Sequence, residues 1–353
     1  MSIRIASGGA TEKAARRVIA RLVDERIASA ITVQDPTLWG PAAEAGATDG
    51  LGWTEAVSDG RGLVHAVESL RSELGRAGAT RVALLAGPVT GLAATTIAAT
   101  QGVALRLLDP HADTVGVALS TAADTVVVLA DAPGSGLAAE ALLQAAEQAV
   151  RSAGVDPERR IVVVAEPGSA LESAATAARL RVFPGAVAVG DRFSALSAAA
   201  LVPAGLAGAD LAELLDEAES EELNLAIDDP SNNGLRLAAH LAALEQDDLA
   251  VVADGTHVVG YDLWAAQLLR AAGLRARALA VDAPERTGLP VLRIVSDAHD
   301  GGRPGPFEVR ISGSLGELLL VLQYTAALLA RLRGADPFGG SAAPAPTPSE
   351  DPR

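Results

Sequence analysis

The chain has 353 residues, of which 49% are hydrophobic and only 3% aromatic, and its formal net charge is −16. So acidic a chain argues against a nucleic-acid partner, because binding to the phosphate backbone depends on Lys and Arg. The absence of cysteine excludes disulfides, thiolate catalysis and cysteine zinc sites. No charge-free run of about 18 apolar residues occurs, so we expect a soluble cytoplasmic protein without a membrane partner.

Residues 1–60 are predicted to form an N-terminal helical region. Apolar residues recur at helical spacing between residues 11 and 30, and Thr11 is the expected N-cap of that helix. The loop QDPTLWGP follows from Gln34, and the segment LGW stands at residues 51–53.

Residues 61–208 are predicted to form an α/β domain. Five apolar runs, VALLAG, VALRLLD, TVVVLAD, IVVVA and RVF, alternate with helical patterns, among them one near 92–100 and one over 136–153. Runs of Val and Leu without polar alternation are typical of parallel strands that are covered on both faces. The pattern therefore indicates a doubly wound parallel sheet of about five βα units, with helices on both faces.

Residues 209–338 repeat this α/β pattern in a shorter form. Asp210 is the expected N-cap of the first helix, and a long apolar helix is predicted over 315–332. After Phe338 the sequence GGSAAPAPTPSEDPR has no apolar face that could offset the entropy of ordering, so residues 339–353 are predicted to be a disordered tail.

The most informative stretch is PGAVAVGDRFSALSAAALVPAGLAGAD, residues 184–210. It is interpreted as a strand exit, a tight turn at Gly190 and Asp191, an exposed Arg192, and a helix that Ser194 caps. A guanidinium beside a hydroxyl and a helix N-terminus is suited to holding an oxyanion or a sugar phosphate.

This stretch resembles the G-G-R-[FY]-S-A-L-[ST] signature of the actinobacterial glucose-6-phosphate isomerases, where it also continues with LVPAGLAG. Two further segments are similar to that family, namely DPTLWGP before the first domain and ADPF after the last helix. The family has a further C-terminal segment where this sequence has its tail. The resemblance implies two sugar-isomerase (SIS), flavodoxin-like domains in a protein able to form a homodimer, with no cofactor and no metal.

The resemblance also assigns candidate site residues. Arg192 stands at the position whose guanidinium stabilises the enediolate intermediate. His257, on a loop at the carboxyl end of a strand, is the best candidate for opening the sugar ring. The residues at the family's phosphate-binding positions, or beside its arginine, are Thr90, Gly91, Gly134, Ser135, Gly136, Gly190 and Ser194.

Other positions depart from the family's pattern. The catalytic Glu of E-S-x-G-K falls on Ala271, and its lysine partner is missing. In the S-K-S-G-T phosphate loop the lysine falls on Ala132 and the first hydroxyl on Pro133. Asp191 replaces the second glycine of G-G-R, and its charge is expected to neutralise Arg192 locally and to repel a phosphate.

Two functions from different classes remain open at this stage. One is a catalytically impaired sugar-phosphate-binding or regulatory protein, either a homodimer or a partner of an intact isomerase. The other is an active isomerase of glucose 6-phosphate and fructose 6-phosphate. Structural alternatives also stand: Arg192 in an ion pair at an interface, a plain βα turn at 134–136, His257 as an ordinary loop residue, and a turn rather than a metal site at 297–300.

Overall fold

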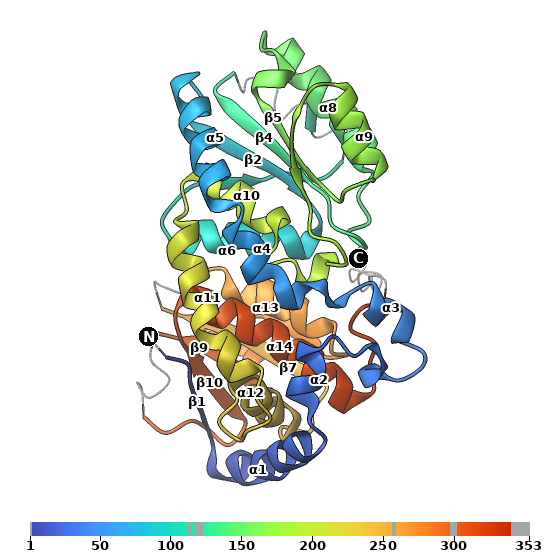
Figure 1. Ribbon diagram of the computed structural model, residues 1–353. Helices are drawn as coiled ribbons and strands as arrows, with labels where there is room; N and C mark the ends of the chain where they lie inside the picture. The colour runs from blue at the N-terminus through green and yellow to red at the C-terminus, as the bar shows by residue number, and fades with distance from the viewer. Residues whose placement is uncertain (1, 112–114, 117–122, 256–258, 297–301, 340–353) are drawn as a thin grey trace, which may run out of the picture.

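The computed structural model describes residues 2–111, 115–116, 123–255, 259–296 and 302–339 (Figure 1). His257, the segment 297–300 and most of the predicted tail lie outside the described residues. The predictions made for these segments remain predictions.

The first sheet is a five-stranded parallel sheet with the order β3-β2-β4-β5-β6. All four neighbouring pairs run parallel. This confirms the parallel sheet that the five apolar runs predicted. The strands are β2 (Arg81–Ala86), β3 (Leu105–Leu107), β4 (Thr125–Ala130), β5 (Ile161–Ala165) and β6 (Arg181–Pro184).

Helices cover both faces of this sheet. Successive residues of a strand point to opposite faces, and on each face apolar strand residues pack against helices. Val82 and Leu84 of β2 belong to one hydrophobic cluster, whereas Ala83 and Leu85 belong to another. The first cluster includes residues of α5 (Val64–Arg76), α6 (Pro88–Thr100) and α10 (Ala198–Ala207). The second includes α8 (Ala139–Ser152) and α9 (Ala170–Ala177), which Figure 1 shows on the other side of the sheet.

The second sheet also has five strands, in the order β1-β10-β9-β7-β8. Four of them run parallel, but β1 pairs antiparallel with β10, from Arg4 opposite Ser312 to Ser7 opposite Val309. The N-terminal region is therefore not purely helical. The strands are β1 (Arg4–Ser7), β7 (Asp248–Asp254), β8 (Arg275–Ala278), β9 (Val291–Val295) and β10 (Glu308–Ser312).

After β1 the N-terminal region consists of short helices. The first begins at Gly9, with Gly8 as the N-cap, so the prediction of Thr11 as the cap is wrong. Thr11 instead donates a hydrogen bond to the carbonyl of Pro306 at 3.0 Å. The helices are α1 (Gly9–Asp24), α2 (Ile27–Thr32), η1 (Pro36–Trp39), α3 (Glu44–Thr48), η2 (Leu51–Glu55) and α4 (Ala56–Arg61).

The second sheet is accompanied by α11 (Leu211–Leu225), α12 (Asn233–Ala242), α13 (Tyr261–Arg270), η5 (Pro284–Arg286) and α14 (Leu315–Arg333). Asp210 caps α11 as predicted, accepting a hydrogen bond from the Glu213 N–H at 3.0 Å. Among the described helices, α14 alone is long and apolar enough to cross a membrane, yet every residue from Leu315 to Ala330 is buried. It packs against α11 and α12 as the central helix of this lobe (Figure 1).

One hydrophobic cluster continues from the first sheet into the second. It contains Val128 of the first sheet together with Leu249 and Ile294 of the second. Between the sheets, the rings of Trp53 and Phe193 stack with their centroids 5.2 Å apart, and Tyr324 meets Trp53 edge-on at 4.8 Å. The two sheets therefore share one core, while the other face of the first sheet packs against α8 and α9 in a cluster of its own.

Candidate functional site

The candidate site is built around the short helix η4 (Asp191–Phe193), which follows the loop after β6. The expected helix N-cap at Ser194 is wrong. Ser194 ends η4, where its hydroxyl donates to the Asp191 carbonyl at 2.8 Å, and α10 begins at Ala198 with Ser197 as its N-cap.

The Asp191 side chain occupies the N-terminus of α6. Its carboxylate accepts hydrogen bonds from the Val89 N–H at 3.1 Å, the Thr90 N–H at 3.0 Å and the Thr90 hydroxyl at 2.7 Å. Asp191 is only 6% exposed. The first turn of a helix presents unpaired N–H groups and the positive end of the helix dipole, which is how helices bind anions. The protein's own carboxylate therefore fills this anion site.

Thr90, Ser194 and Gly87 surround the Asp191 carboxylate. The hydroxyls of Thr90 and Ser194 lie 2.7 Å apart, and both residues are fully buried. A Cβ at Gly87 would stand 2.3 Å from the Asp191 Oδ1 atom, so the close approach of this carboxylate requires glycine there. Gly91 packs against β3 instead, because a Cβ placed there would stand 2.7 Å from the Leu107 side chain.

Arg192 lines a pocket of about 180 Å³ beside this network. Its side chain is half-buried, and its Nη1 atom donates to the Pro337 carbonyl at 3.2 Å. Burial lowers the pKa of Arg192, and the charges of Asp336 and Asp191 oppose that shift. The other lining residues are Gly46, Asp49, Gly50, Pro133, Gly134, Gly190, Asp191, Phe193, Phe338 and Gly339 together with Pro337.

The loop after β4 forms another edge of the candidate site. Gly134 and Gly136 have φ values of 78° and 73°, a backbone conformation that favours glycine. The Ser135 hydroxyl donates to the Asp131 Oδ1 atom at 2.9 Å and accepts from the Leu137 N–H at 3.2 Å. The Pro133 carbonyl accepts from the Asp191 N–H at 2.9 Å, which ties this loop to η4.

Asp131 is a titratable residue of this region that the sequence analysis missed. Burial raises its pKa, and the negative charge of Asp191 raises it further. Shifted carboxyl groups of this kind cluster at functional sites. The available signal was its position directly after the apolar strand TVVVLA, since sites in parallel sheets form at the carboxyl ends of strands.

The structure thus separates the candidate residues into groups. Thr90 and Ser194 join Asp191 in the buried network, whereas Gly134, Gly190 and Arg192 line the pocket. Ser135 bonds to Asp131. Gly91 packs on β3. Gly136 follows in the same loop. Within the described parts of the chain, no group of three or more His, Asp or Glu residues could hold a metal ion.

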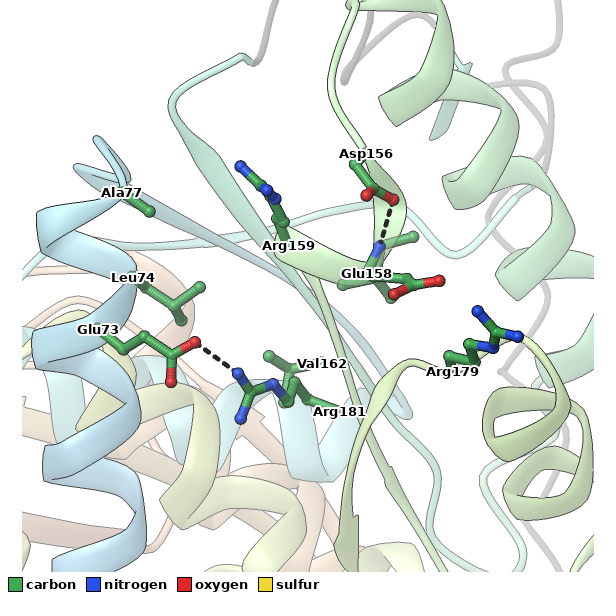
Figure 2. Close-up of a pocket in the computed structure, with 10 residues that line it drawn as sticks. Glu73, Leu74, Ala77, Asp156, Glu158, Arg159, Val162, Arg179 and Arg181 are labelled. Atoms are coloured by element: carbon green, nitrogen blue, oxygen red, sulfur yellow. Dashed lines mark hydrogen bonds and ion pairs between the residues drawn. The ribbon is translucent and has the colours of Figure 1, made fainter.

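A larger pocket, of about 460 Å³, lies at the opposite end of the first sheet, where β5 and β6 begin (Figure 2). It contains three arginines and three acids: Arg181 pairs with Glu73 of α5, and the Asp156 carboxylate accepts from the Glu158 N–H at 3.1 Å. Ligands of open parallel sheets bind at the carboxyl ends of the strands. We therefore take the smaller pocket at Arg192 as the candidate site.

Comparison with known proteins identifies the fold. No protein-family model matches the chain, and no curated protein matches it by sequence. A hypothetical protein from Thermus thermophilus has a similar structure, with a TM-score of 0.75 at 18% identity and 96% of each chain covered. A glucose-6-phosphate isomerase from Chlamydia trachomatis has a TM-score of 0.64 at 16% identity, covering 94% of this chain and 82% of that one.

A third solved structure extends the likeness beyond isomerases. The C-terminal domain of a glucosamine-fructose-6-phosphate aminotransferase from Francisella tularensis has a TM-score of 0.52 at 10% identity, covering 81% of this chain and 96% of that domain. At these identities the likeness concerns the fold. With its two helix-covered, mainly parallel sheets, the chain has the fold of the SIS-type phosphosugar proteins.

Proposed function

We propose that the protein binds a sugar phosphate in the Arg192 pocket and does not turn it over as an isomerase. The pocket supplies a half-buried guanidinium from Arg192, beside the open glycine loop at Gly134 and the turn at Gly190. Guanidinium groups pair well with phosphate oxygens. The likeness to a glucose-6-phosphate isomerase and to an aminotransferase domain of fructose-6-phosphate chemistry supports this class of ligand.

The proposal that the protein does not turn over its ligand is supported chiefly by the position of the Asp191 carboxylate. It fills the N-terminus of α6, so that helix has no free N–H pair to offer a ligand. An aldose–ketose isomerase also needs a base that moves a proton between two carbons, a contribution worth roughly 10²- to 10⁴-fold in rate. The position where the resemblance places that base is Ala271, which is buried at the end of α13.

One observation favours the second candidate, an active isomerase. Asp131 lies at the carboxyl end of β4, burial raises its pKa, and a carboxyl group at such a position can accept and return a proton. Its hydrogen bond with Ser135 holds the carboxyl group beside the glycine loop. This candidate requires Asp131 to take the role of the missing glutamate.

Calorimetric titration with fructose 6-phosphate and a coupled assay for glucose 6-phosphate test both candidates. We expect saturable binding without turnover, and we expect Arg192→Ala to weaken binding by about tenfold or more, because a charge-assisted hydrogen bond is lost. Arg181→Ala, in the distant pocket, is the matched control and should bind as the wild type does. Turnover that disappears in Asp131→Asn would establish the isomerase instead, and the absence of any binding would end the sugar-phosphate proposal.

A further inference from the structure

The end of the described chain lines one side of the pocket at Arg192. We call residues 336–339, with the sequence DPFG, the strap; they follow α14 after its C-cap at Gly334. The Pro337 carbonyl accepts a hydrogen bond from Arg192 Nη1 at 3.2 Å. A peptide oxygen thus takes a guanidinium N–H that a phosphate oxygen would otherwise use.

The Phe338 ring anchors the strap among other aromatic rings. Its centroid lies 4.9 Å from that of Trp39, in an edge-on arrangement, and 5.5 Å from that of Phe193. Such pairs attract beyond the area that they bury. Trp39 is itself fixed, because its Nε1 atom donates to the Ala327 carbonyl of α14 at 2.9 Å. The Phe338 ring is therefore held between Trp39 and Phe193, and we call this site its seat.

Two glycines make room for that ring. A Cβ at Gly50 would stand 2.5 Å from Phe338 Cδ1, and a Cβ at Gly46 would stand 3.2 Å from Phe338 Cβ. Neither glycine has a positive φ, so close neighbours rather than backbone conformation exclude a side chain: the Phe338 side chain at both positions, and at Gly50 also the Gly46 carbonyl oxygen, 2.6 Å from a Cβ placed there. Gly46 and Gly50 thus leave space for the Phe338 side chain.

The strap also carries charge to the site. Asp336 is exposed and acts electrostatically on Arg192, as Asp191 does from the other side. Its Oδ1 atom accepts from the Phe338 N–H at 2.9 Å, which gives the strap a tight turn of its own. An incoming anion would meet a guanidinium already flanked by two carboxylates and already bonded to a carbonyl.

We propose that the strap is a built-in cover that competes with the ligand for Arg192. Binding then requires the Pro337 carbonyl to leave the guanidinium and Phe338 to leave its seat beside Trp39. The affinity of the site is reduced by the fraction of molecules in which the strap is closed. This inference rests on the proposed function for the identity of the ligand, but the cover itself can be tested without one.

The test compares Phe338→Ala with Phe307→Ala, a control that removes an exposed phenylalanine, 57% accessible, elsewhere on the surface. Phenylglyoxal labelling followed by peptide mass spectrometry measures the reactivity of Arg192. We expect Phe338→Ala to raise that reactivity roughly three- to tenfold, as the loss of two ring contacts implies, and Phe307→Ala to leave it unchanged. If Arg192 reacts with phenylglyoxal equally in Phe338→Ala and in the wild type, the proposal that the strap covers Arg192 is wrong.

Titration with fructose 6-phosphate adds a second arm. We expect Phe338→Ala to bind more tightly than the wild type by a similar factor, and the wild type to lose part of its Trp39 fluorescence signal on binding, a change that Trp39→Phe should abolish. Weaker binding in Phe338→Ala would show the strap to be part of the binding surface and would overturn the proposal. Raised Arg192 reactivity with no binding in any variant would support the cover and reject the proposed function.

Discussion

Asp191 shows most clearly what one residue does to this site. Both Asp191 and Arg192 line the pocket, and the Asp191 carboxylate bonds to the first turn of α6, about a hundred residues earlier in the chain. Removing a side chain that caps a helix N-terminus usually costs about 0.5–2 kcal/mol. At the same position glycine would leave the Val89 and Thr90 N–H groups without their acceptor.

We therefore predict that Asp191→Gly lowers the free energy of unfolding by about 1–2 kcal/mol and strengthens phosphate binding, because an anion site with a helix dipole opens. Urea denaturation measures the first effect, and titration with inorganic phosphate and with fructose 6-phosphate measures the second. Asp191→Asn keeps an acceptor but removes the charge, so its affinity should lie between those of the wild type and of Asp191→Gly. Equal affinities in all three proteins would contradict this account.

The sequence indicated the importance of Asp191 but not its contacts. Adjacency to Arg192 predicted an electrostatic effect on that guanidinium, and the charge of Asp191 does act on it. The hydrogen bonds to Val89 and Thr90 could not be predicted, because they depend on how β6 and α6 are placed in space. Phe338 is a similar case: ADPF was visible as a segment, but its seat needs Gly46, Gly50 and Trp39 together.

At the scale of elements, the pair α11 and α14 concentrates negative charge. Burial raises the pKa of Glu217 and of Glu221, and the charge of Glu317 on α14 raises both further. A raised pKa means that the folded state holds its protons to higher pH than the unfolded chain does. These groups therefore favour folding near and below the ordinary glutamate pKa, and that contribution is lost as the pH rises through the raised values.

We predict that Glu221→Gln stabilises the protein at pH 7.5, by about 1 kcal/mol, and that the difference shrinks at pH 5. The Glu221 carboxylate accepts hydrogen bonds from Asn233 Nδ2, at 2.9 Å, and from the Ile3 N–H. The amide oxygen can still accept the Asn233 bond, so the substitution removes the charge and keeps this contact. Urea denaturation of both proteins at the two pH values measures the effect. Glu68→Gln, at an exposed position on α5, is the control, and an equal gain there would refute a specific role for burial.

The elements themselves were predictable to different degrees. Long apolar patterns gave correct strands in the first sheet and a correct α14, since burial on both faces leaves an unmistakable run of Val, Leu and Ala. The strand β1 was missed because four residues, RIAS, show too little alternation to be distinguished from a loop. Helix starts failed at Thr11 and Ser194, where a hydroxyl bonds to a distant or local carbonyl instead of to the helix.

At the scale of the molecule, the shared core has a thermodynamic consequence. One hydrophobic cluster runs through both sheets, and the rings of Trp53, Phe193 and Tyr324 lie between them. Lobes that share buried surface to this extent lose much of their stability when either one unfolds.

We predict a single cooperative transition in differential scanning calorimetry, with the calorimetric and van't Hoff enthalpies in agreement. Trp53→Ala should lower the midpoint temperature without splitting the transition, since a buried Trp→Ala change typically costs about 3–5 kcal/mol. Two resolved transitions in the wild type would show that the lobes fold independently. Phe307→Ala, on the surface, provides the control.

The antiparallel pairing of β1 with β10 bears on how the chain is made. Arg4 and its partner Ser312 lie about 300 residues apart in the chain, so Arg4 leaves the ribosome well before Ser312 does. During synthesis at about 5–20 residues per second, the first lobe has time to form while β1 still waits for its partner. The pairing closes a loop of about 300 residues, and a contact of such long sequence separation is slow to form. We therefore expect the pairing of β1 with β10 to form late in folding, after the strands and helices of the first lobe have packed.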